Sequence, residues 1–278
     1  MQSHPAQPAP RPASEPIISL QGISKSFGDV QALTDVSIDV PRGRTTVVLG
    51  PSGCGKSVML KHIIGLLRPD AGIVEFDGRR IDRLGERDLV DIRTRVGFLF
   101  QQGALFDSMT VGQNIAFPLR QHTDLSVQQR RERVDRMLDL VGVPGTANRM
   151  PAELSGGQQK RIALARAVIL EPDVVLYDEP TTGLDPIRAD VIAQLIIRLQ
   201  NELALTSVVV THDIPTAFKI ADTMVMMQSG RVLLAGDPSM FKSSDDEAVR
   251  RFLDGEASPE ELGALVHSTE SPDEDAAP

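Results

Sequence analysis

Hydrophobic and polar residues alternate with several periods along this chain, and each period predicts one kind of element. Runs of apolar and β-branched residues, typical of strands buried on both faces, occur at 45–49, 95–100, 173–178 and 207–211. Alternation of apolar and polar residues predicts half-exposed antiparallel strands at 17–20 and 35–40, and an edge strand of a hairpin at 73–78. Apolar residues at helical spacing predict helices at 58–64, 111–119, 127–141, 157–170 and 187–203. This order predicts an α/β fold whose parallel core is interrupted by a helical insert.

Composition sets the expected domain boundaries. Residues 1–16, built from Pro, Ala, Gln and Ser, predict a disordered arm. We expect one domain at 17–242, with a helical subdomain at about 101–167 and an antiparallel β subdomain. An acidic extension follows at 243–278, and its spacing predicts short helices at 241–253 and 259–265 before a disordered end.

Charge is uneven along the chain. Of its 38 acidic residues, eleven fall within 244–278, where Arg250 and Arg251 are the only basic residues. The remaining 27 basic and 27 acidic residues balance, and such a neutral body is a poor match to nucleic acid. The single cysteine excludes a disulfide framework and a thiolate metal site. No apolar run approaches the length of a membrane span, so we expect a soluble, cytoplasmic protein.

The strand at 45–49 leads directly into a phosphate-binding motif. Residues 50–57 match G-x-x-x-x-G-K-[ST] at every fixed position, and they are Gly50, Pro51, Ser52, Gly53, Cys54, Gly55, Lys56 and Ser57. A strand, a glycine loop and a helix N-terminus point backbone N–H groups at an anion. Lys56 would reach the β- and γ-phosphates, and the Ser57 hydroxyl would ligate Mg²⁺. The sequence therefore predicts a nucleoside triphosphate site, in which Cys54 is a small filler residue.

Two acidic residues end the strand at 173–178. Asp178 stands at the tip, where it can hold Mg²⁺ through water, and Glu179 lies just beyond, placed to orient and polarise an attacking water. Acidic residues at strand ends are common. Downstream of a P-loop and followed by Pro180, the pair predicts the hydrolytic half of the site.

A second anion-binding helix start follows Leu154. Ser155 is suited to cap the helix, and the N–H groups of Gly156 and Gly157, with Gln158 next, would form an anion site. One chain does not need two γ-phosphate sites. The economical interpretation is that this helix covers nucleotide held by another copy of the chain.

In this order the motifs resemble the ABC-transporter ATPase family over nearly all of residues 17–240. The resemblance implies a RecA-like P-loop core, ATP with Mg²⁺, and ATP hydrolysis. It assigns Phe27 to adenine stacking, Gln101 to Mg²⁺ and the water, and His212 to the γ-phosphate. Gln102 leaves a one-residue ambiguity, and the spacing from Phe100 favours Gln101. The family signature is matched by Ser155, Gly156, Gly157 and Gln158, and its D-loop by Gly183, Leu184 and Asp185.

The same resemblance implies a head-to-tail dimer with two ATP molecules between the P-loop of one copy and the signature of the other. Val58 departs from the family pattern, in which a Thr hydroxyl more often touches the α-phosphate. This departure predicts slightly weaker nucleotide binding at a working site.

A narrower resemblance lies in residues 99–120, 138–150 and 251–255, which are similar to the ATPase of Mla/Mce-type lipid transport systems, the MlaF-like branch. That branch implies an integral-membrane permease, a Mce-domain protein and a STAS-domain protein as partners. The cargo it implies is phospholipid moved between the inner and outer membranes. The ATPase is then expected on the cytoplasmic face of the inner membrane, and the apolar stretch after Gln101 would suit a groove for the permease.

Two other functions stay open from the sequence. An ATPase of a polar amino-acid or osmolyte importer shares all the catalytic motifs. A soluble ABC-type ATPase of DNA repair or translation predicts a coiled-coil insert, paired cysteines or two ATPase units in one chain, and none of these occurs here.

Overall fold

The structure is a computed structural model that describes residues 16–101 and 103–256. The predicted arm, apart from Pro16, and the helix predicted at 259–265 lie outside these residues. So does Gln102, the alternative to Gln101.

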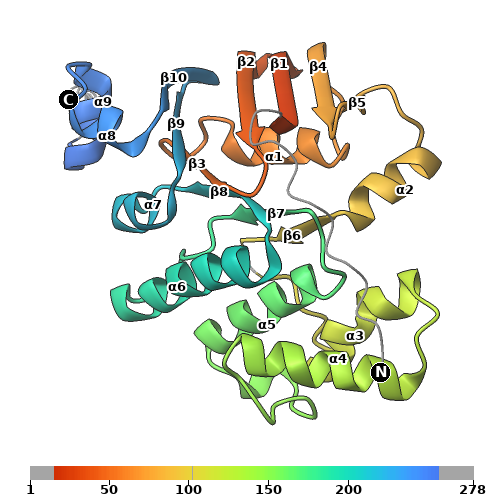
Figure 1. Cartoon of the computed structure of the whole chain (residues 1–278). Helices are drawn as coiled ribbons and strands as arrows, with labels where there is room; N and C mark the ends of the chain where they lie inside the picture. Colours follow the sequence, from red (N-terminus) through yellow and green to blue (C-terminus); the bar gives the residue numbers. More distant parts are fainter. Residues whose placement is uncertain (1–15, 102, 257–278) are drawn as a thin grey trace, which may run out of the picture.

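Two sheets form the body of the chain (Figure 1). The smaller sheet is antiparallel, has the order β2-β1-β4-β5, and consists of β1 (Pro16–Phe27), β2 (Val30–Pro41), β4 (Ala71–Phe76) and β5 (Arg79–Arg80). The larger sheet has the order β10-β9-β3-β8-β7-β6, and all its strands are parallel except β10. Its strands are β3 (Thr45–Leu49), β6 (Val96–Leu99), β7 (Val174–Asp178), β8 (Thr206–Thr211), β9 (Thr223–Gln228) and β10 (Arg231–Gly236).

Helices cover the larger sheet and extend the body away from the smaller one. Figure 1 shows α3, α4 and α5 together at the end opposite β1, β2 and β4, with the larger sheet between. The α-helices are α1 (Lys56–Ile63), α2 (Glu86–Thr94), α3 (Val111–His122), α4 (Val127–Leu140), α5 (Gly156–Val168), α6 (Pro186–Leu203), α7 (Ile214–Ile220), α8 (Pro238–Lys242) and α9 (Glu247–Asp254). A short 3₁₀ turn, Pro151–Glu153, precedes α5.

The larger sheet is buried on both faces, as its uninterrupted apolar runs predict. Side chains alternate across each strand, so Val47 and Leu49 pack in one apolar cluster with α5 and α6, while Val48 packs in another with α1 and the smaller sheet. All five residues of β3 are buried. The α/β fold with an antiparallel sheet and inserted helices is confirmed, whereas the domain boundaries stay predictions.

Three details differ from the sequence expectation. Strand β4 is not at an edge, because the short β5 pairs with it beyond the turn at Asp77. The helix predicted at 241–253 is two helices, since the Asp246 carboxylate accepts hydrogen bonds from the N–H groups of Ala248 and Val249 and starts α9 there. Helices α2 and α7 and strands β5, β9 and β10 were not predicted.

An ion-pair network ties the two sheets together at the end of β6 remote from Gln101. Arg95 donates to Asp77 in the smaller sheet's hairpin at 2.7 Å and to Asp173 before β7 at 2.6 Å. Its guanidinium also lies 4.9 Å from the centre of the Phe76 ring. Arg42 is a second partner of Asp77. The hydrogen bond from Arg95 holds the pKa of the Asp77 carboxyl below its ordinary value.

We expect Arg95→Met to lower the free energy of unfolding by about 1–2 kcal/mol. Arg95 joins three segments, which favours a large loss, but its side chain is 38% exposed, and screening by solvent keeps the loss moderate. The Asp77 contribution is present above the ordinary carboxyl pKa and is lost as pH falls through the lowered value. Urea unfolding at neutral and acidic pH measures both effects, and the difference between variants should shrink in acid. Arg79→Met is the control, since Arg79 lies 3.9 Å from Asp88 at the surface. Equal stability of the two variants would contradict the prediction.

Candidate functional site

The predicted phosphate loop lies between β3 and α1, and two of its glycines are required by close neighbours. A Cβ on Gly50 would lie 2.2 Å from the carbonyl oxygen of Met227. A Cβ on Gly55, which has a φ of +101°, would lie 2.5 Å from the carbonyl oxygen of Ala32. The loop therefore fits against β9 and β2 only with glycine at these positions.

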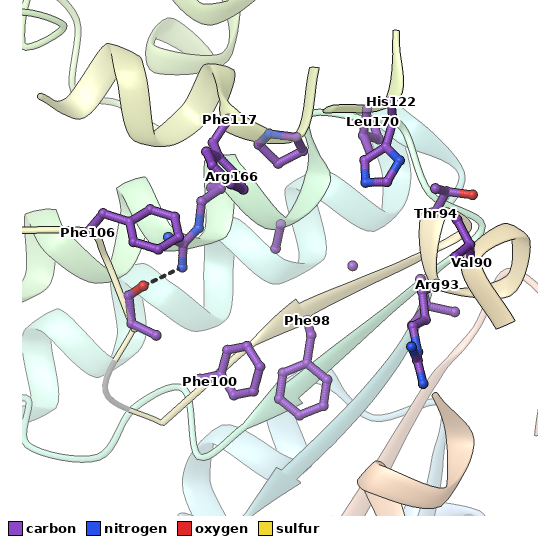
Figure 2. Close-up of a pocket in the computed structure, with 15 residues that line it drawn as sticks. Val90, Arg93, Thr94, Phe98, Phe100, Phe106, Phe117, His122, Arg166 and Leu170 are labelled. Atoms are coloured by element: carbon purple, nitrogen blue, oxygen red, sulfur yellow. Dashed lines mark hydrogen bonds between the residues drawn. The ribbon is translucent and has the colours of Figure 1, made fainter. Parts of the chain in front are cut away.

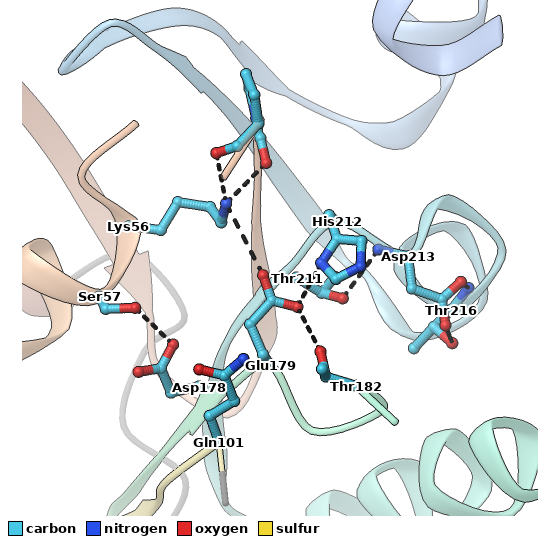
Figure 3. Close-up of polar contacts among 12 residues, drawn as sticks. Lys56, Ser57, Gln101, Asp178, Glu179, Thr182, Thr211, His212, Asp213 and Thr216 are labelled. Carbon is cyan, nitrogen blue, oxygen red and sulfur yellow. Dashed lines mark hydrogen bonds and ion pairs between the residues drawn. The ribbon is translucent and has the colours of Figure 1, made fainter. Parts of the chain in front are cut away.

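Lys56 begins α1, and its side chain turns back into the loop. The ammonium donates to the carbonyl oxygens of Gly50 at 2.7 Å and Pro51 at 2.9 Å, and lies 3.8 Å from the carboxylate of Glu179 (Figure 3). The side chain is only 6% exposed. A buried ammonium surrounded by backbone oxygens can take a phosphate oxygen in their place.

Ser57 and Asp178 meet although they are 121 residues apart in sequence. The Ser57 hydroxyl donates to the Asp178 carboxylate at 2.8 Å (Figure 3). Burial raises the pKa of Asp178, and this hydrogen bond opposes the rise. Both groups are hard oxygen donors of the kind that Mg²⁺ prefers, and Mg²⁺ bound with a nucleotide needs few further protein ligands. No cluster of three His, Cys, Asp or Glu side chains that could hold a metal occurs within 16–101 and 103–256.

Glu179 follows Asp178 in a left-handed conformation, with a φ of +51°. Its backbone N–H donates to the carbonyl oxygen of Val210 at 2.9 Å. One carboxylate oxygen lies 2.8 Å from Nδ1 of His212 and accepts from the Thr182 hydroxyl at 3.3 Å. The conformation turns the chain out of the sheet after Asp178. Thr182 was not predicted, because its role depends on a turn that sequence spacing does not reveal.

Gln101, the residue predicted to contact Mg²⁺ and the water, is exposed two residues beyond the end of β6. Figure 3 shows its side chain beside those of Asp178 and Glu179. Its carbonyl oxygen accepts a hydrogen bond from Lys160 of α5 at 3.1 Å. The structure thus gathers Lys56, Asp178, Glu179 and His212 with Gln101.

The predicted signature residues stand apart from this group. Ser155 caps α5, accepting from the N–H of Gln158 at 3.4 Å, while its own N–H donates to the Gln158 amide oxygen at 3.0 Å. Ser155 and Gly156 are exposed, Gly157 is buried, and Gln158 is half-buried. Within the described part of the chain no hydrogen bond joins Ser155 to the phosphate loop.

The other predicted binding residues lie around the loop. Ser52 and Gly53 are exposed, Pro51 is half-buried, and Val58 packs against the smaller sheet's apolar cluster. Burial raises the pKa of the Cys54 thiol, which suits an inert filler residue. Phe27 is 46% exposed at the end of β1, with the Lys25 ammonium 5.6 Å from its ring centre.

The predicted D-loop leads into α6. Gly183 has a φ of +78°, Leu184 packs against the core, and the Asp185 carboxylate caps α6 by accepting from the N–H of Arg188 at 3.0 Å. Gly183 and Leu184 line a cavity of about 450 Å³ together with His212.

An apolar groove of about 550 Å³ lies between β6 and the helices that follow Gln101. Figure 2 shows Phe98 and Phe100 on one side and Phe106 and Phe117 on the other, with Arg166 beside Phe106. The guanidinium of Arg166 lies 5.4 Å from the Phe106 ring centre. The groove therefore begins at Phe100, the residue immediately before Gln101.

A strand–loop–helix phosphate cradle with an acidic pair beside it defines this chain as a P-loop ATPase. The ABC transporter family profile matches residues 33–182. The chain is 41% identical over 239 residues to the "intermembrane phospholipid transport system ATP-binding protein MlaF" of Escherichia coli K12, a match that covers 86% of this chain and 89% of MlaF. This chain belongs to the ABC transporter ATP-binding family, and it hydrolyses ATP.

A second kind of relative has a different name. The "probable ribonucleotide transport ATP-binding protein mkl" of Mycobacterium leprae is 43% identical over 238 residues, which is 86% of this chain and 69% of mkl. The fold matches solved cassettes as well. The structure of cbiO1 from Clostridium perfringens has a TM-score of 0.77 and 30% identity, covering 91% of this chain and 100% of cbiO1.

A dimeric structure of the cassette MJ0796 bound to ADP and Pi has a TM-score of 0.73 and 34% identity, covering 79% of this chain and 98% of MJ0796. The predicted family, fold, ATPase activity and ATP binding are thereby confirmed. The individual roles of the site residues stay predictions. Over the described residues no helix has the length and apolar character needed to cross a bilayer.

We expect Gly55→Ala to destabilise the nucleotide-free protein by several kcal/mol, because the added methyl would meet both Ala32 and Leu33 and the backbone has a φ of +101°. Gly53→Ala is the matched control, since nothing lies within 4 Å of its added methyl. It should cost only about 1 kcal/mol for its left-handed backbone. Denaturant unfolding without nucleotide measures the difference. Equal losses in both variants would show that the contacts with β2 are not limiting.

Proposed function

We propose that this chain is the ATP-hydrolysing subunit of a membrane complex that moves phospholipid between the inner and outer membranes. The observation that carries this proposal is the likeness to MlaF, which extends over 89% of that protein's length at 41% identity. The mkl relative is named for ribonucleotide transport, and the match covers a smaller share of its length. Phospholipid is therefore the cargo we favour, and a polar solute is the alternative that the experiment below distinguishes.

The proposed roles follow from the geometry of the site. Lys56 would exchange the carbonyl oxygens of Gly50 and Pro51 for oxygens of the β- and γ-phosphates. Glu179 would orient the attacking water, with His212 and Thr182 fixing its carboxylate. Phosphoryl transfer depends on such positioning and on charge neutralisation more than on covalent chemistry.

Nucleotide binding would involve three further groups. Ser57 and Asp178 would hold Mg²⁺, directly and through water, with Gln101 nearby, and the ion would neutralise charge on the transferring phosphoryl group. The exposed ring of Phe27 would stack on adenine. Among the described residues no hydrogen bond joins Ser155 at the exposed start of α5 to its own phosphate loop, which supports a head-to-tail dimer in which Ser155 covers nucleotide bound by the second copy.

The groove beside Gln101 supports a membrane partner. Its aromatic lining, with Phe100 and Phe106 each more than 40% exposed, suits an apolar helix of a permease. Gln101 would then report occupancy of the groove to the catalytic residues. We place the complex on the cytoplasmic face of the inner membrane, with a STAS-domain and a Mce-domain protein as further partners and without nucleic acid.

The shared site makes a prediction about mixed dimers. Ser155→Arg should bind ATP but not hydrolyse it, because the arginine would obstruct nucleotide held by the second copy. Lys56→Ala should fail in its own copy. Mixing the two variants should restore about a quarter of wild-type activity, since half of randomly formed dimers are mixed and each has one intact site. ATPase assays over a range of mixing ratios check this, and activity that never exceeds that of either variant alone would contradict the shared site.

The cargo is tested by gentle solubilisation of membranes that contain the tagged chain, followed by identification of the proteins that co-purify. We expect a permease with STAS-domain and Mce-domain proteins, and movement of labelled phospholipid in proteoliposomes made from that complex with ATP. The same complex with Glu179→Gln should assemble, bind ATP and move no lipid. A permease found with a soluble solute-binding protein would reject phospholipid as cargo and support the importer.

A further inference from the structure

Helix α5 connects the predicted signature residues at its start with the loop that follows β6. Lys160, in the second turn of the helix, donates from its ammonium to the carbonyl oxygen of Gln101 at 3.1 Å. A longer contact of 3.4 Å joins the same ammonium to the carbonyl oxygen of Glu179. One side chain of α5 therefore holds the backbone of two residues of the ATP site.

The surroundings of Lys160 explain why its ammonium binds these two carbonyl oxygens. The side chain is half-buried, and no carboxylate of residues 16–101 and 103–256 forms an ion pair with it. Burial lowers the pKa of the ammonium, while the nearby charge of Glu179 opposes the change. A desolvated ammonium needs hydrogen-bond acceptors. The carbonyl oxygens of Gln101 and Glu179 are these acceptors. The position of the Lys160 side chain and the positions of these two backbone segments therefore depend on one another.

The two residues held in this way need positioning. Glu179 has a left-handed backbone, which for a non-glycine residue costs on the order of 1 kcal/mol and must be held by neighbours. Its N–H is held by Val210 and its carbonyl oxygen by Thr182 and Lys160. Gln101 is exposed. Its backbone is joined to the helical part by the hydrogen bond that its carbonyl oxygen accepts from Lys160.

A second cation of α5 holds the next part of the same loop. Arg166 donates to the carbonyl oxygens of Gly103 at 2.9 Å and Ala104 at 2.8 Å. Ala104 is also left-handed, with a φ of +48°. Helix α5 thus holds the first part of this loop through Lys160 and Arg166.

We propose that Lys160 is a positioning residue for ATP hydrolysis, which sets the backbone of Glu179 and Gln101 according to the position of α5. The inference concerns the rate of hydrolysis and is independent of the cargo. It rests on the role proposed above for Glu179. Lys160 acts through these two residues and does not contact the nucleotide.

The test compares variants of the purified full-length chain. Lys160→Met keeps the length of the side chain but removes the donor. We expect kcat to fall about tenfold, the equivalent of ~1.4 kcal/mol, with Kd for ATP changed less than twofold. Lys160→Gln retains two N–H donors and should recover most of the rate. Arg161→Met is the matched control, because Arg161 is the neighbouring cation on α5 and donates to Gly142 instead.

The rate is expressed per nucleotide-binding site, measured by ATP titration, so that unfolded chains are not counted. Lys160→Ser, which is too short to reach either carbonyl, replaces Lys160→Met if that variant does not fold. A wild-type kcat in the donor-free variant, a loss equal to that of Arg161→Met, or no recovery in Lys160→Gln would each overturn the inference.

Glu179→Gln is assayed in parallel to separate two kinds of failure. Glu179→Gln can abolish turnover while the donor-free Lys160 variant turns over at the wild-type rate. In that case Lys160 has no positioning role, and the proposed catalytic site stands. If Glu179→Gln turns over at the wild-type rate, the role of Glu179 is wrong and the inference about Lys160 fails with it.

Discussion

The parallel register of three neighbouring strands is the constraint on which the site depends. Leu49 of β3 pairs with Thr211 of β8, and Asp178 of β7 pairs with Val210 of the same strand. The residues that follow each strand therefore emerge at one edge of the sheet. Burial on both faces fixes the register of these strands. A slip by one residue would turn apolar side chains of a strand to the opposite face of the sheet, and it would also separate the residues proposed for catalysis. The register that stabilises the sheet therefore also sets the geometry of the site.

The groups proposed for ATP binding and hydrolysis form hydrogen bonds and ion pairs with one another. Lys56 is bonded to its own loop, Ser57 to Asp178, and Glu179 to His212 and Thr182. An unpaired charge in such a place would cost several kcal/mol. In the proposed roles, nucleotide would therefore replace interactions that these protein groups make with one another.

The sequence predicted the parts of this site that depend on strand tips and on local motifs. Glycine spacing and the strand before it located Lys56 and Ser57, and the apolar run before Asp178 located the acidic pair. Thr182 and Lys160 were not predicted as members of the site, because a hydroxyl or an ammonium that meets a group across the fold has no local pattern. The split of the helix predicted at 241–253 was missed for a related reason. Apolar spacing continues through 241–253, and the break depends on how the Asp246 carboxylate is placed.

Helix α5 contacts several parts of the molecule through few side chains. Its first residues, Ser155 and Gly156, are exposed, while Lys160 and Arg166 donate to backbone carbonyl oxygens beside the proposed catalytic residues and the groove. Bonds to carbonyl oxygens fix the path of the chain whatever side chains it carries. A rigid helix held in this way moves as one body. In the proposed dimer, closure at the start of α5 and occupancy of the groove would therefore both act on the same loop, at Gln101.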